Sequence, residues 1–441
     1  MFWRKKHPRP QHQNAHYARL IFQSLLARHP DPKSLDHCSS ELDNGLDLRC
    51  LVDRITQSGE YLDSHDPNPA SPDGGRPRVW TDAAFAAYRD GAEIKSILLM
   101  KTDHLGDFIL ALDSFSAFRT AFPTASITLL CGPWNAPLAN SLGIFDAVET
   151  IDFFASRPDD LQPSFTPEML GRVGRAHFDL AVDLRVDADT RVAFDHLNAT
   201  YKCGYASKRC RSALTISLPR PNYTQINGVA NHQRMMMLGL ARNVVDFFQP
   251  QAEFSAAALR RKLAGPAAAD AWRGRGKRLV SMQPYSGRAI KNWPIEDFMK
   301  LAGWLSGEMN VSVVLLGTKS DAADMSPIAS ACESADVKSA IGQTSLLEAI
   351  SIIGAADLHI GNDSGLTHVA ARMDVPTVAI YSGVAQTELW APFGRHVTVI
   401  NAPVACSPCH LMDVKDCQNG RKCIDAIDFE FVRSEVRKRL S

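Results

Sequence analysis

The stretch IGNDSGLTHVAARMDVPTVAIYSG, residues 360–383, has the pattern of a strand, a sharp turn, a helix and a second strand. Apolar residues from Leu366 to Met373 recur at the helical spacing i, i+3, i+4, i+7, and residues 362–365 are turn and capping residues. A helix that begins at the carboxyl end of a buried strand directs free N–H groups and a positive dipole there, which suits a phosphate. The pattern also fits an ordinary βαβ crossover with a good N-cap, and this stretch alone favours that interpretation.

Apolar runs that alternate with helical patterns continue on the N-terminal side of this stretch. Residues 96–100, 126–131, 178–184 and 278–283 are nearly continuous apolar runs, as expected for strands buried on both faces of a parallel sheet. The predicted fold class is therefore α/β, with two Rossmann-like doubly wound domains facing a central cleft and an extra N-terminal segment. We expect an extension and linker at 1–93, the two domains at 94–255 and 278–428, and a helix at 429–441.

The composition of the 441-residue chain excludes several classes of protein. Lys plus Arg and Asp plus Glu both number 48, so no basic field indicates a nucleic-acid partner. No apolar run is long enough to span a bilayer, and no apolar segment follows the basic start MFWRKKHPRP. We therefore expect a globular protein of the cytoplasm, and the ten cysteines, scattered except for four near the end, fit that reducing compartment.

Two loops that follow predicted strands carry charged residues. In KTDHLGD, residues 101–107, Asp107 is a candidate general base or the N-cap of the next helix. In SGRAIKNWP, residues 286–294, Arg288 and Lys291 suit a diphosphate, although a solvated basic loop has the same appearance. No GxGxxG follows the first strand, which argues against a dehydrogenase.

Four cysteines near the C-terminus form a separate pattern, Cys406-x2-Cys409-x7-Cys417-x5-Cys423. Four thiols in so short a span suit a structural zinc ion or disulfides. The spacing is not that of a standard zinc ribbon. We interpret the segment as a structural clip and leave metal binding open.

These features occur in an order that resembles glycosyltransferase family 9, the ADP-heptose:lipopolysaccharide heptosyltransferases. They are GD at 106–107, KNWP at 291–294, LLGT at 315–318 and GNDSGLTHVAA at 361–371. Residues 340–357, AIGQTSLLEAISIIGAAD, and 375–383, VPTVAIYSG, add to the match. The resemblance covers the chain from about residue 94 onward and leaves the first 93 residues outside it.

The resemblance implies a GT-B fold, with the acceptor in the first domain and the nucleotide-sugar in the second. It implies inversion without a metal or another cofactor. By position, Asp107 becomes the base and Lys291 neutralises the leaving diphosphate. The remaining donor-site residues implied are Arg288, Asp363, Ser364, Gly365, Leu366 and His368, of which Asp363 is expected to cap the helix or bond a sugar hydroxyl rather than touch phosphate.

A D-x-D pattern, Asp187 and Asp189, follows Arg185 and allows a competing interpretation. In another class of glycosyltransferases such a pair holds a divalent metal on the donor diphosphate. This pair lies in the expected acceptor domain, so we favour acceptor contacts by Arg185 and Asp187, or a helix cap.

The predicted function is an inverting, metal-independent glycosyltransferase that moves heptose from ADP-heptose onto a lipopolysaccharide core or a related surface glycan. The expected partners are the nucleotide-sugar and a glycolipid or oligosaccharide acceptor, with peripheral contact at the inner membrane. Where the family carries an acidic residue after LLG, this chain has Lys319 and Ser320, with Asp321 later. The alternatives are therefore another nucleotide-sugar, or a non-catalytic nucleotide-binding protein with a zinc-binding Cys tail.

Overall fold

A computed structural model of the chain describes residues 37–40, 93–153, 165–166, 168–187, 189–206, 214–218, 232–249, 271–323, 328, 332, 334–402 and 404–440. Contacts divide the chain into two units, Met1–Glu93 and Ile94–Ser441. The extension and linker expected at 1–93 lie outside the described residues, except for 37–40 and 93. The following description concerns the second unit.

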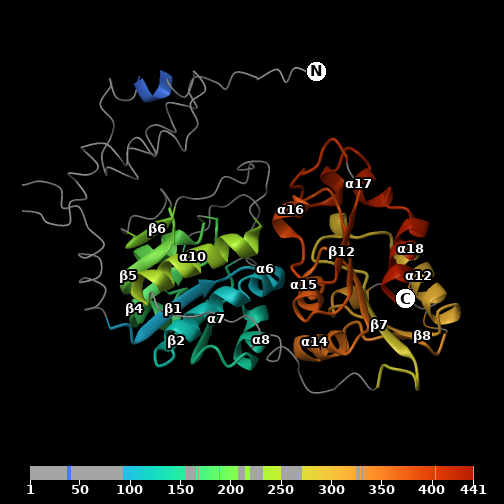
Figure 1. The fold of residues 1–441 in the computed structure, drawn as a ribbon, viewed down its shortest axis with the longest axis horizontal. Coiled ribbons are helices and arrows are strands. Elements are labelled where there is room, and N and C mark those ends of the chain that lie inside the picture. The colour runs from blue at the N-terminus through green and yellow to red at the C-terminus, as the bar shows by residue number, and fades with distance from the viewer. Residues whose placement is uncertain are drawn as a thin grey trace, which may run out of the picture. The chain divides into compact units, whose positions relative to one another are not determined.

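The first sheet of this unit has six parallel strands in the order β3-β2-β1-β4-β5-β6 (Figure 1). The order changes direction between β1 and β4, and ligands of open α/β sheets bind outside the carboxyl ends of the strands at such a switch point. The strands are β1 (Ser96–Lys101), β2 (Ser126–Cys131), β3 (Ala147–Thr150), β4 (His177–Asp183), β5 (Asn198–Tyr205) and β6 (Ile216–Leu218).

The second sheet repeats this arrangement with six parallel strands in the order β12-β11-β10-β7-β8-β9. Its switch point lies between β7 and β10, the strands that precede the loops holding Lys291 and Asp363. The strands are β7 (Arg278–Gln283), β8 (Val311–Leu315), β9 (Val337–Ser339), β10 (Leu358–Asn362), β11 (Thr377–Tyr381) and β12 (Val397–Asn401).

Helices follow most strands, as the alternation in the sequence predicts (Figure 1). The single helix expected after the first strand is two helices, α6 and α7, which meet at Ala111. The principal helices are α6 (Leu105–Leu110), α7 (Leu112–Ala121), α8 (Ala136–Ser141), α10 (Gln233–Phe248), α12 (Ile295–Gly307), α14 (Leu346–Gly354), α15 (Gly365–Arg372), α16 (Thr387–Trp390), α17 (Lys422–Asp425) and α18 (Phe429–Leu440).

The core of the second domain includes the C-terminal helix. Val432, Val436 and Leu440 of α18 are buried in the cluster formed by β7, β8, β10 and α12. Trp293, the largest fully buried side chain, donates its indole N–H to the Ile427 carbonyl at 3.0 Å. Burial of an indole of this size stabilises the fold and fixes the end of the Lys291 loop against the C-terminal segment.

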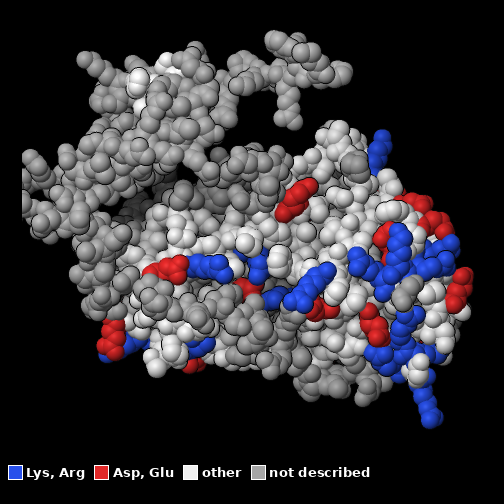
Figure 2. All heavy atoms as spheres, in the orientation of Figure 1, with Lys and Arg blue, Asp and Glu red and all other residues white. Residues whose placement is uncertain are grey.

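Basic side chains are not evenly distributed over the surface. Figure 2 shows Lys and Arg side chains, with acidic ones among them, gathered on the part of this face where Figure 1 places α12 and α18. The last turn of α18 carries Arg437, Lys438 and Arg439. No helix among the described residues is long and apolar enough to cross a bilayer.

Candidate functional site

The carboxyl end of β1 holds a buried charged pair. The Lys101 ammonium lies 2.5 Å from the Asp103 carboxylate, and both side chains are almost completely buried. Burial lowers the pKa of Lys101 to about 8, against the opposing effect of the nearby Asp107 charge. Lys101 therefore places a positive charge beneath the loop that was predicted to hold the base.

Asp107 lies in the first turn of α6, and the N-cap of that helix is His104. The N-cap role considered for Asp107 is therefore wrong. Burial raises the pKa of the Asp107 carboxyl, while the charges of Lys101 and Lys291 oppose that rise. A carboxylate whose pKa is raised is a stronger base than an ordinary surface aspartate, which is the property required to accept a proton from a hydroxyl.

Arg185, after β4, is the centre of an acidic cluster at the same switch point. Its guanidinium makes two hydrogen bonds to Asp189, at 2.6 and 3.0 Å, and forms ion pairs with Asp103 and with Asp187, the latter at 3.5 Å. Both carboxylates of the D-x-D pattern thus contact an arginine. Arg185 and Asp187, the two residues predicted to contact the acceptor, lie together and are partly exposed.

Lys291 and Asp363 meet at the second switch point. Lys291 lies at the end of a short 3-10 turn, η3 (Ala289–Lys291), and its ammonium is 2.6 Å from the Asp363 carboxylate, 72 residues further along. Asn362 fixes the two loops relative to each other, because its side-chain amide accepts from the backbone N–H of Trp293 at 3.0 Å and donates to the Pro284 carbonyl at 2.7 Å. The predicted cation and the predicted carboxylate therefore form one unit.

The N-terminus of α15 differs from the prediction in one respect. Ser364 is the N-cap residue, but its side chain makes no cap hydrogen bond and donates instead to the Gln283 amide oxygen. The first N–H groups of α15 therefore have no side-chain cap, which leaves donors for an anion. The Asp363 side chain pairs with Lys291 rather than capping this helix.

His368 is buried one turn into α15. Burial lowers its pKa to about 4, so the ring is neutral near pH 7. Its Nδ1 has no hydrogen-bond partner among the described residues. The side chain lies so close to Gly106 that a Cβ there would be 3.1 Å from the ring. His368 of the second domain therefore contacts the residue before Asp107.

The two domains contact each other directly at α6 and α15. A Cβ at Gly365 would lie 2.8 Å from the Cβ of Leu105, so only glycine allows this approach. Burial lowers the pKa of His104, the N-cap of α6, and the charges of Arg288 and Lys291 lower it further. The close contact therefore brings the cations of the second domain to the helix that carries Asp107.

A buried charge cluster lies in the same contact. Asp113 of α7 accepts hydrogen bonds from Arg234 of α10 and from Arg372 of α15. The Arg234 guanidinium also stacks 4.0 Å from the centre of the Phe393 ring, and His232 contacts the Ala391 carbonyl at 2.8 Å. Contacts from α10 and α7 to the second domain are thus polar and specific.

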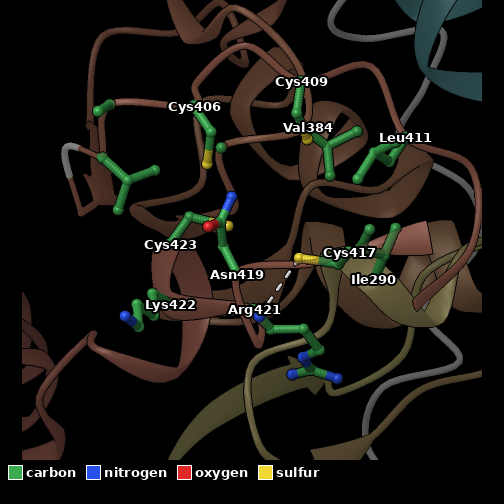
Figure 3. A pocket seen from close by; sticks show the side chains of 13 residues that line it. Ile290, Val384, Cys406, Cys409, Leu411, Cys417, Asn419, Arg421, Lys422 and Cys423 are labelled. Carbon is green, nitrogen blue, oxygen red and sulfur yellow. Dashed lines mark hydrogen bonds between the residues drawn. The ribbon is translucent and has the colours of Figure 1, made fainter. Parts of the chain in front are cut away.

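The four C-terminal cysteines line one cavity of about 320 Å³ (Figure 3). All four are free thiols; Cys406 is exposed and Cys423 is buried. Within the described part of the chain, no group of three or more His, Cys, Asp or Glu side chains is arranged to hold a metal ion. Zinc binding at Cys406, Cys409, Cys417 and Cys423 therefore stays a hypothesis.

Sequence reasoning missed several members of the site. Asp103 stands in the quoted KTDHLGD loop, and its position after a buried strand was a usable signal. Lys101 was quoted as the first residue of that loop, but it is the last residue of β1 and no role was predicted for it. Asp113, Arg234 and Arg372 have no local pattern, because the contact between them joins helices far apart in the sequence.

The architecture defines a class of protein. Two six-stranded parallel sheets, each with one switch point, make a GT-B fold. The structure of E. coli ADP-heptose lipopolysaccharide heptosyltransferase II superposes with a TM-score of 0.56 at 18% identity, covering 78% of this chain and 98% of that one. E. coli heptosyltransferase WaaC with ADP gives a TM-score of 0.59 at 15% identity, covering 78% and 99%.

The chain belongs to glycosyltransferase family 9, the heptosyltransferase family, whose model matches residues 170–418. This match confirms the resemblance described above. Lipopolysaccharide heptosyltransferase 2 of Salmonella typhimurium is 35% identical over 113 residues, 25% of this chain and 32% of that protein. The core heptosyltransferase OpsX of Haemophilus influenzae is 19% identical over 306 residues, 65% and 79% of the two chains. The alignment with the Salmonella protein thus spans about a third of its length.

Proposed function

We propose that the protein is an inverting glycosyltransferase that moves heptose from ADP-heptose onto a lipopolysaccharide core or a related bacterial surface glycan. One observation carries the proposal. Helix α6, which carries Asp107, packs directly against α15 of the second domain, and the His368 side chain of α15 lies beside Gly106. The Lys291–Asp363 pair lies in the loops of that second domain, and Asp363 directly precedes the N-cap of α15. A candidate base and a candidate leaving-group cation thus lie on the two sides of one contact between domains, as a direct displacement requires.

The acceptor hydroxyl would lose its proton to Asp107. The raised pKa of this carboxyl makes it a better proton acceptor, and Lys101 stabilises the ionised form needed before the reaction. Arg185 and Asp187 lie at the same switch point and would bond hydroxyls or acidic groups of the acceptor. The oxygen of the acceptor would then attack the anomeric carbon from the side opposite the diphosphate.

The diphosphate would leave toward Lys291 and the N-terminus of α15. Breaking the glycosyl–phosphate bond builds negative charge on the diphosphate, so a fixed cation and uncapped N–H groups stabilise the transition state more than the ground state. Ser364, Gly365 and Leu366 supply these N–H groups, and Arg288 supplies a second positive charge. The neutral His368 would add a hydrogen bond without adding charge.

The reaction proposed here needs no metal or other cofactor. Lys291 and Arg288 provide the positive charge on the donor that a divalent ion provides in D-x-D enzymes. Asp187 and Asp189 are both engaged by Arg185, which competes with a cation for their oxygens. We place the enzyme in the cytoplasm, where nucleotide-sugars are made, in peripheral contact with the inner membrane that carries the acceptor.

The relatives named above support heptose as the sugar and ADP as the nucleotide. A different nucleotide-sugar stays open, because Asp321 bonds the Thr318 N–H and hydroxyl of its own loop, both at 2.7 Å. Since these bonds occupy Asp321, another group would have to recognise the ribose.

The decisive experiment measures sugar transfer from ADP-heptose to a heptose-deficient lipopolysaccharide core. Wild-type protein should transfer the sugar with inversion, and Asp107→Ala should not. Thermal shifts with a panel of nucleotide-sugars identify the donor, since only a ligand that binds the native state raises Tm. Equal transfer by wild type and Asp107→Ala would remove Asp107 as the base, and no transfer from any donor would refute the proposal.

A further inference from the structure

The η3 turn that carries Lys291 accepts hydrogen bonds from Arg421, which belongs to the Cys-rich segment, residues 406–423. The Arg421 guanidinium donates to the Asn292 carbonyl at 2.7 Å and, at the long limit of a hydrogen bond, to the Ala289 carbonyl at 3.5 Å. These two carbonyls lie on either side of Lys291 in the sequence. One side chain therefore fixes the backbone on both flanks of the lysine.

Arg421 is itself fixed. Its guanidinium pairs with Asp425 at 2.9 Å, and its backbone N–H donates to the Cys417 sulfur at 3.4 Å, drawn as the dashed line in Figure 3. Its φ of 54° lies in the left-handed region, which costs a non-glycine residue energy. Strained residues of this kind persist where surrounding contacts determine them and cluster at functional sites.

One side of this turn borders a cavity. Ile290, in the middle of η3, lines the cavity of about 320 Å³ together with Arg421 and the four cysteines. Atoms that border a cavity lose van der Waals contacts on that side. The hydrogen bonds from Arg421 consequently contribute more to the position of the turn than they would over a packed surface.

We infer that Arg421 is a positioning residue for Lys291, and that the Cys-rich segment is the support of the leaving-group site. The inference rests on the proposed function. Arg421 does not replace Lys291 in binding the diphosphate, because its amino groups are already used by two carbonyls and by Asp425. A lysine at position 421 cannot reproduce this forked contact.

Three variants separate positioning from folding. Arg421→Gly removes the guanidinium but relieves the left-handed strain, so the protein should stay folded. Arg421→Lys keeps the charge without the fork. Lys422→Ala removes an exposed cation one residue further on and is the matched control. We expect both Arg421 variants to lower kcat for transfer about 10- to 100-fold with a smaller change in KM, since a misplacement of about 1 Å costs this much. Lys422→Ala should keep wild-type kinetics.

A double-mutant cycle with Lys291→Met tests the link between the two residues. If Arg421 acts through Lys291, Arg421→Gly should change kcat less than about threefold once Lys291 is absent. An equal loss from Arg421→Gly in both backgrounds would overturn the inference, as would wild-type kinetics for Arg421→Gly alone.

ADP binding provides a second cycle that needs no sugar transfer. Titration calorimetry should show Arg421→Gly weakening ADP binding in the wild-type background and not in Lys291→Met. If ADP binding shows this coupling but no donor supports sugar transfer, the proposed function is refuted and the inference about Arg421 stands. Transfer by wild type together with independent effects of the two mutations would refute only the inference. Absence of both transfer and ADP binding would refute both.

Discussion

Asp113 and Arg372 form an ion pair between the two domains, although they are 259 residues apart in the sequence. Arg234 binds the same carboxylate, with Nε at 2.6 Å and Nη2 at 2.5 Å. The side chain of Asp113 is 1% exposed, and those of Arg372 and Arg234 are 10% and 13% exposed. A single buried carboxylate thus pairs with guanidinium groups from both domains.

We predict that Asp113→Asn destabilises the protein by about 3–5 kcal/mol, because it removes the charge of a buried carboxylate that pairs with two mostly buried arginines. Urea unfolding measures the loss. The control is Lys415→Ala, which breaks an ion pair with Asp413 whose side chains are 77% and 51% exposed. That change should cost less than about 1 kcal/mol. Equal losses for the two variants would contradict a special role for Asp113.

Asp107→Asn should reduce the rate of sugar transfer by about 10²- to 10⁴-fold, the usual contribution of a general base. Wild-type kcat/KM should decline on the acidic side with an apparent pKa above that of an ordinary aspartate, because burial raises the pKa of Asp107. The pH profile of wild type from pH 4 to 8 measures this. A profile that declines only near the pKa of a surface carboxyl would contradict the assignment.

The same variant should change the pH dependence of stability. With the pKa of Asp107 raised in the folded state, the unfolded chain releases this proton at lower pH. Stability of the wild type is therefore lost as pH rises from the unfolded pKa through the folded one. Asp107→Asn lacks this loss, so its stability relative to wild type should increase over that window and then level off. Urea unfolding at several pH values tests it; a constant difference would contradict it.

Gly365→Ala should lower transfer about 100-fold while each domain stays folded, because the new Cβ would push α15 away from Leu105 and separate the two halves of the site. Gly239→Ala is the matched control, since nothing lies within 4 Å of a Cβ there and the residue is inside α10. Alanine in a helix interior should stabilise it by about 0.5–1 kcal/mol with transfer unchanged. Activity equal to wild type in Gly365→Ala would show that the close approach is unnecessary.

Exhaustive dialysis against EDTA should leave the transfer rate of the wild type unchanged, because the cationic side chains Lys291 and Arg288 act on the donor. The rate before and after dialysis, with magnesium added back, measures this. Loss on chelation and recovery with magnesium would instead favour a metal at Asp187 and Asp189, and Asp189→Asn would then abolish the recovery.

Most strands of the two sheets could be predicted from the sequence, because strands buried on both faces leave continuous apolar runs. The expected strands at 126–131, 278–283 and 377–381 coincide with β2, β7 and β11. Strands β5, β6, β9 and β12 were missed, because these segments are only partly buried and lack a continuous apolar run. Asp107, Lys291 and Asp363 were predicted because each follows a predicted strand and falls in a motif of the resembled family.

The contacts between residues of the candidate site were harder to predict than which residues belong to it. Lys291 and Asp363 were both predicted in the donor site, but their direct pairing depends on Asn362, which joins two loops about 80 residues apart. Asp113 was hidden because a buried aspartate inside an apolar helix looks like a surface residue in the sequence. Helix α10 was not predicted either, and Arg234 could not be placed without it.

The pairing of Lys291 with Asp363 has a consequence for which anions the site accepts. Before a donor arrives, the lysine is occupied by a tethered carboxylate, which competes at the high effective concentration of an intramolecular partner. A small monovalent anion offers one charge, so it would compete weakly with this carboxylate. In the proposed reaction, a diphosphate would offer two or more charges and the N–H groups of α15 would bind it at the same time. Asp363 would then disfavour small anions at Lys291 relative to a diphosphate.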